Sequence, residues 1–178
     1  FIYGPDVARG ERGRLTVAAL SNVATLLGHG DKLAYVGSQP NGQGLRDVGA
    51  TANSLPGYAP VTDAAARDRL GKLWGVQPPA EPGLSYQEMI DGGVKALFAM
   101  EADPAASPAA AAALKQLDFL VCQDLFLTET AKLAHVVLPA TSWAEADATY
   151  TNLERRAQRA PAGIGAAGGS LPGWAVLT

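Results

Sequence analysis

Polar side chains follow two short apolar runs in the second half of the chain, at residues 119–122 and 136–138. Asp124, Thr128 and Glu129 come directly after the first run. In an open α/β sheet, ligands bind in the crevice beyond the carboxyl ends of the strands. If both runs are buried strands, these side chains lie where a nucleotide-like ligand would bind. Asp124 has a second interpretation, because an aspartate before a helix caps the first turn by accepting its backbone amides, and Thr128 and Thr130 suit the same role.

A loop of small and polar residues, Asn41-Gly42-Gln43-Gly44, follows a predicted strand at residues 32–36. Glycines in such a loop let backbone amides approach an anion closely. The same glycines are typical of a turn that requires positive φ angles. The residue types leave both interpretations open.

Arg155 and Arg156 are adjacent in a stretch of mostly small residues. A planar guanidinium suits a phosphate or carboxylate ligand. The simpler interpretation is an ion pair that pins the segment to the domain, with one of three nearby carboxylates as the partner: Glu145, Asp147 or Glu154.

His29 and His135 are far apart and lack metal-ligand spacing, so we expect surface or capping roles for both. Cys122 is the single cysteine and lies within an apolar run. One cysteine cannot form an intrachain disulfide or hold an iron–sulfur cluster by itself. We therefore expect Cys122 to be an inert core residue and predict no metal site.

Apolar runs and helical patterns alternate along the chain, which predicts an α/β fold: a three-layer, doubly wound, mostly parallel sheet with helices on both faces. A capping pattern, Ser85 followed by Glu88, predicts a helix start. Residues 1–160 form one predicted domain, and residues 161–178 a linker and the start of a next element. The predicted strands are residues 1–3, 32–36, 95–100, 118–123 and 135–139, the predicted helices are 15–27, 85–90 and 104–116, and residues 44–82 hold only short helices.

The chain has 178 residues, 48% of them hydrophobic and 17% charged, which is typical of a globular domain. The net charge of −3 argues against nucleic acid or an anionic membrane surface as a partner. No apolar run reaches the ~18 residues of a membrane-spanning helix, so we expect a soluble domain without direct membrane insertion. Because Phe1 already lies in an apolar run, the chain is expected to be a piece of a longer polypeptide.

Four motifs occur in the order of a known family: N-G-Q-G-L-R-D-V-G-A at 41–50, L-P-G-Y at 55–58, Q-D-L-F-L-T-E-T-A-K-L-A-H-V-V-L-P-A at 123–140, and A-E-A-D-A-T-Y-T-N-L-E-R-R-A-Q at 144–158. They resemble the molybdopterin oxidoreductase superfamily and, within it, the large iron–sulfur subunit of respiratory NADH:quinone oxidoreductase, complex I. The resemblance covers roughly residues 33–158.

The resemblance implies a cofactor pocket. In cofactor-binding members, a carboxylate at the position of Asp124 accepts N–H groups from the guanine edge of a pterin dinucleotide. The loop at residues 41–44 belongs to the domain that holds one half of that cofactor. The implied pocket consists of Asn41, Gly42, Gln43, Gly44, Glu101, Asp103, Asp124, Thr128 and Asn152.

The chain departs from the family pattern in one loop and at two single positions. Glu101-Ala102-Asp103-Pro104 stands where cofactor-binding members have G-E-N-P, which puts carboxylates at positions 101 and 103, where the pattern has glycine and asparagine near a pyrophosphate. Two like charges ~4 Å apart repel by ~1 kcal/mol in water and by more in a partly buried site. Ala148 replaces a glycine, which implies strain if φ there is positive. His135 replaces an aspartate at the start of a strand, a milder change.

These departures predict a vestigial pocket in a structural domain of the complex I subunit, without its own cofactor or catalysis. The resemblance then implies iron–sulfur clusters elsewhere in the parent subunit, loss of molybdopterin, other peripheral-arm subunits as partners, and a position on the cytoplasmic side of the inner membrane. One alternative is a cofactor-holding domain of a molybdopterin-dependent oxidoreductase such as formate dehydrogenase. Another is a regulatory domain that binds a free nucleotide at the loop of residues 41–44.

Overall fold

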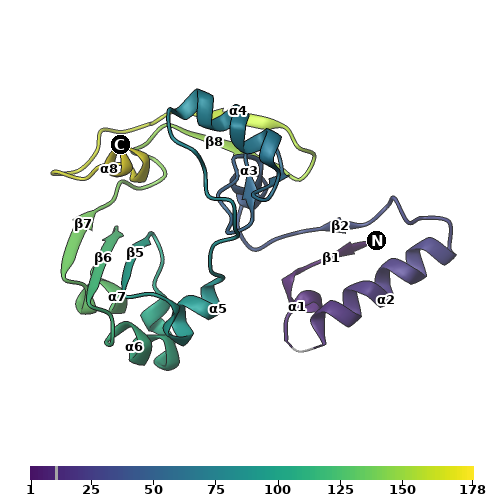
Figure 1. Cartoon of the computed structure of the whole chain (residues 1–178), viewed down its shortest axis with the longest axis horizontal. Coiled ribbons are helices and arrows are strands. Elements are labelled where there is room, and N and C mark those ends of the chain that lie inside the picture. Colours follow the sequence, from purple (N-terminus) through teal and green to yellow (C-terminus); the bar gives the residue numbers. More distant parts are fainter. Residues whose placement is uncertain (11) are drawn as a thin grey trace. The chain divides into compact units, whose positions relative to one another are not determined.

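The computed structural model describes residues 1–10 and 12–178 and has the α/β fold expected from the sequence (Figure 1). In chain order the elements are β1 (Ile2–Tyr3), α1 (Pro5–Ala8), α2 (Gly13–Leu26), β2 (Ala34–Tyr35), α3 (Gly42–Asp47), β3 (Ser54–Leu55), β4 (Ala59–Pro60), α4 (Ala64–Trp74), α5 (Tyr86–Glu88), the π-helical turn η1 (Met89–Gly93), β5 (Ala96–Met100), the 3₁₀ turn η2 (Pro104–Ala106), α6 (Pro108–Leu114), β6 (Phe119–Asp124), α7 (Glu129–Leu133), β7 (Val136–Pro139), β8 (Ala148–Thr151), β9 (Ala157–Ala160) and α8 (Gly173–Leu177). No described helix has the length and apolar character needed to cross a membrane.

The chain forms two compact units. The first contains Phe1–Ala59 and Thr149–Gln158, and the second contains Pro60–Ala148 and Arg159–Thr178. The sequence predicted one domain through residue 160, and the contacts within the structure divide the same residues between these two units. The strands also pair in separate sets, because β1 pairs with β2 and β5, β6 and β7 form another sheet. Apolar runs locate strands, but the partner of each strand is decided by contacts distant in sequence.

The second unit is built on the parallel sheet β5-β6-β7. One face is covered by the turns and helices that connect the strands, and its core is Ala105, Leu114 and Leu120. Cys122 is fully buried, as predicted, and desolvation raises the pKa of its thiol. Burial of these side chains from neighbouring elements provides the main hydrophobic stabilisation of the unit.

Residues 161–178 contact this sheet, whereas the sequence predicted a linker followed by the start of an element. Gln123 is fully buried, and its Nε2 donates a hydrogen bond to the Leu171 backbone oxygen at 2.9 Å. A Cβ added at Gly173 would lie 2.6 Å from the Met100 sulfur. The predicted element is present as α8, but the segment before it is part of the second unit.

Local capping signals were reliable guides to helix starts. Ser85 and Glu88 form the predicted capping box of α5. In contrast, the sequence predicted only short helices in residues 44–82 and gave no bounds for α4. This helix begins after Asp63, whose side chain accepts the Ala66 N–H at 3.1 Å, and ends before Gly75. This helix buries only two residues, so its apolar periodicity is weak. The predicted helix at 104–116 is two elements, because Pro108 has no N–H and restricts the residue before it.

Candidate functional site

The structure distributes the predicted pocket residues between the two units. Glu101, Asp103, Asp124 and Thr128 belong to the second unit. Asn41, Gly42, Gln43, Gly44 and Asn152 belong to the first unit.

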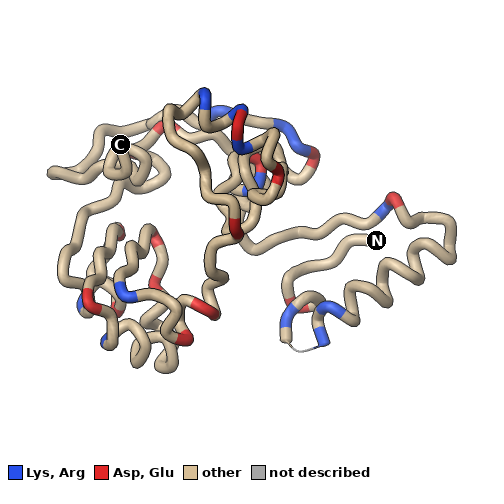
Figure 2. Tube along the Cα trace, viewed as in Figure 1, with Lys and Arg blue, Asp and Glu red and all other residues tan. Residues whose placement is uncertain are grey.

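The first group lies at the carboxyl ends of the strands in the parallel sheet. Met100 ends β5 opposite Gln123, and Asp124 ends β6 opposite Pro139. Acidic residues stand at the end of β6 and in the loop after β5 (Figure 2). The register therefore creates the type of edge at which open α/β sheets bind their ligands.

Asp124 is half-buried at this edge, and its side chain is largely free for a ligand. One carboxylate oxygen, Oδ1, accepts the Leu125 N–H at 2.7 Å. The other oxygen has no hydrogen-bond partner within residues 1–10 and 12–178. The helix that follows is capped by Thr128, whose hydroxyl accepts the Ala131 N–H at 3.2 Å. Of the three residues that the sequence left as candidates for that cap, Asp124, Thr128 and Thr130, Thr128 is the one used.

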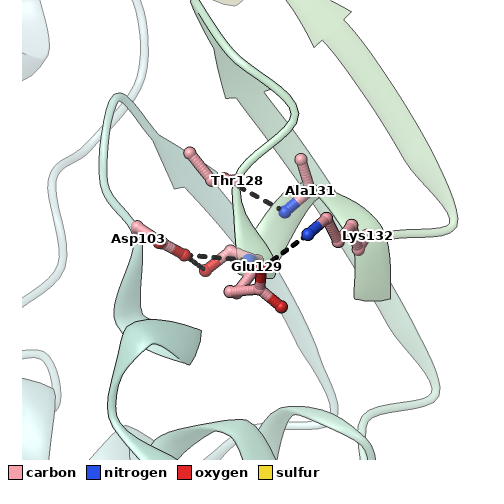
Figure 3. A network of polar contacts seen from close by, with 6 residues as sticks. Asp103, Thr128, Glu129, Ala131 and Lys132 are labelled. Atoms are coloured by element: carbon pink, nitrogen blue, oxygen red, sulfur yellow. Dashed lines mark hydrogen bonds and ion pairs between the residues drawn. The ribbon is translucent and has the colours of Figure 1, made fainter.

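Asp103 is bonded to α7 by a partly buried network (Figure 3). Its Oδ1 accepts the Thr130 hydroxyl at 2.7 Å and the Thr130 backbone N–H at 2.8 Å. The hydroxyl bond is the main cause that lowers the pKa of Asp103. The Thr130 hydroxyl in turn accepts the Ala105 N–H at 3.0 Å. This carboxylate therefore joins the loop after β5 to the start of α7.

Glu101 follows β5 with φ at 49°, a left-handed conformation that non-glycine residues adopt at an energetic cost. Its backbone N–H bonds to the Gln123 oxygen at 2.8 Å, so the conformation is held by the sheet. The position where the family pattern has glycine thus keeps a backbone that favours glycine. The Glu101 side chain is exposed.

The other two departures from the family pattern are accommodated. Ala148 begins β8 and is absent from the positive-φ residues of the described chain, so the expected strain does not arise there. His135 is exposed, and its Nδ1 accepts the Leu120 N–H at 3.0 Å. Accepting a backbone N–H is a bond that a carboxylate can also make, so an imidazole at this position preserves the contact chemistry.

The loop at residues 41–44 is anchored by Asn41. Its Nδ2 donates to the Thr149 oxygen at 3.0 Å, and its Oδ1 accepts the Thr151 N–H at 2.9 Å. A Cβ at Gly44 would lie 2.2 Å from Asn41 Oδ1. Gly42 and Gly44 are not among the glycines with positive φ. The positive-φ interpretation is therefore wrong, and Gly44 is required because the Asn41 side chain packs against its Cα.

A cavity of about 430 Å³ adjoins this loop in the first unit. Polar side chains in its wall include those of Ser38, Gln43, Arg46 and Thr151. Among the described residues of its lining there is no aspartate or glutamate, and Arg46 is the single charged side chain. The wall therefore offers hydrogen-bonding groups and one positive charge to a ligand.

Asp47 and Tyr58 contribute to this unit, and sequence reasoning missed both. Arg155 pairs with Asp47 at 2.9 Å, not with any of the three carboxylates considered from the sequence. Arg156 does pair with one of them, Glu154, at 3.6 Å. The motif 41–50 contains Asp47, but nothing in the sequence indicates that a residue 108 positions later is its partner.

Asn152 has a local role in the turn after β8. Its Oδ1 accepts the Arg156 N–H at 2.9 Å. Among the residues that the structure describes, no group of three or more His, Cys, Asp and Glu side chains could hold a metal ion.

Comparison with known proteins decides the family. A family model described as molybdopterin oxidoreductase matches residues 1–178. The chain belongs to the molybdopterin oxidoreductase family. The α subunit of F420-dependent formate dehydrogenase from Methanocaldococcus jannaschii is 40% identical, over 99% of this chain and 28% of that protein. Formate dehydrogenase H from Escherichia coli is 35% identical, over 89% of this chain and 24% of that protein.

A respiratory relative is also similar. A subunit of the NADH-quinone oxidoreductase from Rhizobium meliloti is 36% identical, over 86% of this chain and 19% of that protein. The chain thus spans between 19% and 28% of the length of these three relatives. Membership in the family is shared by formate dehydrogenases and a complex I subunit, so it does not by itself select between the two functions.

Proposed function

We propose that this chain is a cofactor-holding domain of a molybdopterin-dependent oxidoreductase of the formate dehydrogenase type. The observation that carries the proposal is Asp124, which stands at the carboxyl edge of the parallel sheet with one carboxylate oxygen available. A carboxylate suits the adjacent N–H donors of a guanine edge. Several similar proteins are formate dehydrogenases, which supports this function over the complex I assignment.

The charges at the sheet edge fit the cofactor better than the sequence suggested. Asp103 accepts two hydrogen bonds from Thr130, so its charge is compensated within the protein. The exposed Glu101 side chain can turn toward solvent, where its repulsion of a pyrophosphate is weak. The buried Gln123 Oε1, next to Asp124 in the chain, has no partner among the described residues. Such an orphaned acceptor indicates that this end of the sheet accommodates a further donor.

When bound, the cofactor would supply the redox chemistry at its metal. In the second unit, Asp124 would hold and orient a guanine ring, and Asp103 and Thr130 would keep the loop after β5 in place. The cavity of the first unit is a candidate site by itself, and Gln43 in its wall would offer a hydrogen-bonding group to a ligand there. None of these residues is required to transfer a proton or an electron.

A second candidate is the cofactor-free structural domain of the complex I subunit. Glu101 favours it, because a carboxylate replaces glycine at the loop where the family pattern has the pyrophosphate. The similar subunit from Rhizobium meliloti favours it as well. In this case the sheet edge would be retained for folding and assembly alone.

The test is an assay of pterin, molybdenum and tungsten in the native protein purified with whatever it binds in the cell. We expect about one pterin per wild-type protein. The Asp124→Ala variant should hold about tenfold less pterin, because it loses one or two hydrogen bonds to the cofactor. The matched control is Asp118→Ala, because Asp118 precedes the same strand at the opposite edge of the sheet. Absence of pterin and both metals from the wild-type protein would refute the cofactor function and support the structural domain.

A further inference from the structure

Two non-glycine residues with left-handed backbones face each other in the first unit. Tyr58 has φ at 65° and Arg155 has φ at 61°. The Arg155 guanidinium carbon lies 5.0 Å from the centre of the Tyr58 ring, a cation–π contact. Strained backbones of this kind persist only where surrounding contacts determine them, and they cluster at functional sites. The contact between these two residues therefore indicates a functional role for this part of the first unit.

Both residues converge on Asp47, the last residue of α3. Arg155 donates to Asp47 Oδ1 at 2.9 Å, and Gln43 Nε2 donates to the same oxygen at 3.2 Å. The Tyr58 hydroxyl is the main cause that lowers the pKa of Asp47, and Gln43 and Arg155 lower it further. A carboxylate can only accept hydrogen bonds, so Arg155 and Gln43 are the donors in these two contacts.

This arrangement determines which way the Gln43 amide points. Its Nε2 donates to Asp47 and also to the Tyr58 hydroxyl, which uses both N–H groups of the amide. Gln43 is part of the cavity wall, and Thr151 and Leu153 line the same cavity from the segment that carries Arg155. The polar atom that Gln43 has left for a ligand is its carbonyl oxygen, Oε1.

We propose that Arg155 is a positioning residue that acts through Asp47 and holds Gln43 so that its carbonyl oxygen is presented to a ligand in the cavity. The ligand it fits carries an N–H donor on a heterocyclic ring, such as the amino group of a pterin. This deepens the proposed cofactor function and rests on it for the identity of the ligand. Arg155 also ties residues 151–153 to α3 across 108 residues of sequence, which keeps that wall of the cavity in place.

The test compares Arg155→Met, Arg155→Lys and Arg156→Met in the native protein. Arg156 is the matched control, since it is adjacent and exposed and pairs with Glu154 alone among the described residues. We expect Arg155→Met to lower the pterin retained after extensive dialysis by about tenfold, the effect of one lost hydrogen bond. Arg155→Lys should recover part of the retention, because it keeps the charge opposite Asp47 and loses the planar fork.

Hydrogen–deuterium exchange across residues 149–156 gives a second measurement that needs no ligand. Exchange in Arg155→Met should be at least about fivefold faster than in Arg156→Met, because the bond from Thr151 N–H to Asn41 opens more often. If wild-type protein holds pterin and Arg155→Met retains it equally, the proposal is overturned. If wild-type protein holds no pterin, the cofactor function fails, and equal exchange in the two variants would then overturn the positioning role separately.

Discussion

Replacing Thr130 with valine tests whether the partly buried network around Asp103 supports the sheet edge. Thr130 is fully buried, and valine has nearly the same shape, so the change creates little cavity. In wild type the Thr130 hydroxyl accepts the Ala105 N–H at 3.0 Å. Valine removes this acceptor, and because Ala105 is only 7% exposed, its N–H is left without a partner. An orphaned buried donor costs about 1–3 kcal/mol, so we expect a loss of about 2 kcal/mol in the free energy of unfolding.

The assay is urea denaturation followed by far-ultraviolet circular dichroism. In thermal unfolding, the same loss of about 2 kcal/mol would lower the Tm by about 4–8 °C for a chain of this size. Thr149→Val is the control, because Thr149 is exposed and its hydroxyl has no hydrogen-bond partner in the described part of the chain. A Thr130→Val variant within about 0.5 kcal/mol of wild type, the usual range of neutral surface changes, would refute the reasoning.

The same variant should change the titration of Asp103. The Thr130 hydroxyl is the largest cause of the lowered pKa, so its removal raises the pKa toward that of an ordinary aspartate. A carboxyl group with a lowered pKa stabilises the folded state above its unfolded pKa, and this stabilisation is lost as pH falls through the folded pKa. The stability difference between wild type and variant should therefore shrink in acid. An unchanged Asp103 titration, followed by carboxyl carbon NMR, would contradict this role.

Three further outcomes follow from single contacts. Gly44→Ala should destabilise the protein by about 1–3 kcal/mol, as overpacking does, because its Cβ would overlap the Asn41 side chain; a neutral result in urea denaturation would contradict the close contact. Glu101→Gly should stabilise by about 0.5–1 kcal/mol because the φ of 49° no longer carries a Cβ penalty, and a loss of stability would count against it. The hydrogen bond from the Ala162 N–H lowers the pKa of Asp147. The protection of this N–H against hydrogen exchange should therefore be lost as the pH falls through the pKa of Asp147 in the folded protein. Undiminished protection in acid would contradict this bond.

Much of the sheet edge could be predicted from residue types. The apolar runs identified β6 and β7, and the rule for open α/β sheets indicated that Asp124 lies at a ligand-binding edge. The orientation of Asp103 could not be predicted, because it depends on Thr130, which is 27 residues away and reaches it through the packing of α7 against η2. The sequence suggested that Asp103 brings an uncompensated negative charge to the site, but in the structure its carboxylate accepts two hydrogen bonds from Thr130.

The sequence by itself determined what short-range chemistry controls: the strands of the parallel sheet β5-β6-β7, the capping box at Ser85 and Glu88, the buried Cys122, and membership in the family. These features depend on residues within a few positions of each other, or on hydrophobicity alone. The tertiary structure decided the division into two units, the pairing of Arg155 with Asp47, and the need for glycine at position 44. The physical reason is that these contacts join segments up to 110 residues apart, where side chains meet only after the chain has folded.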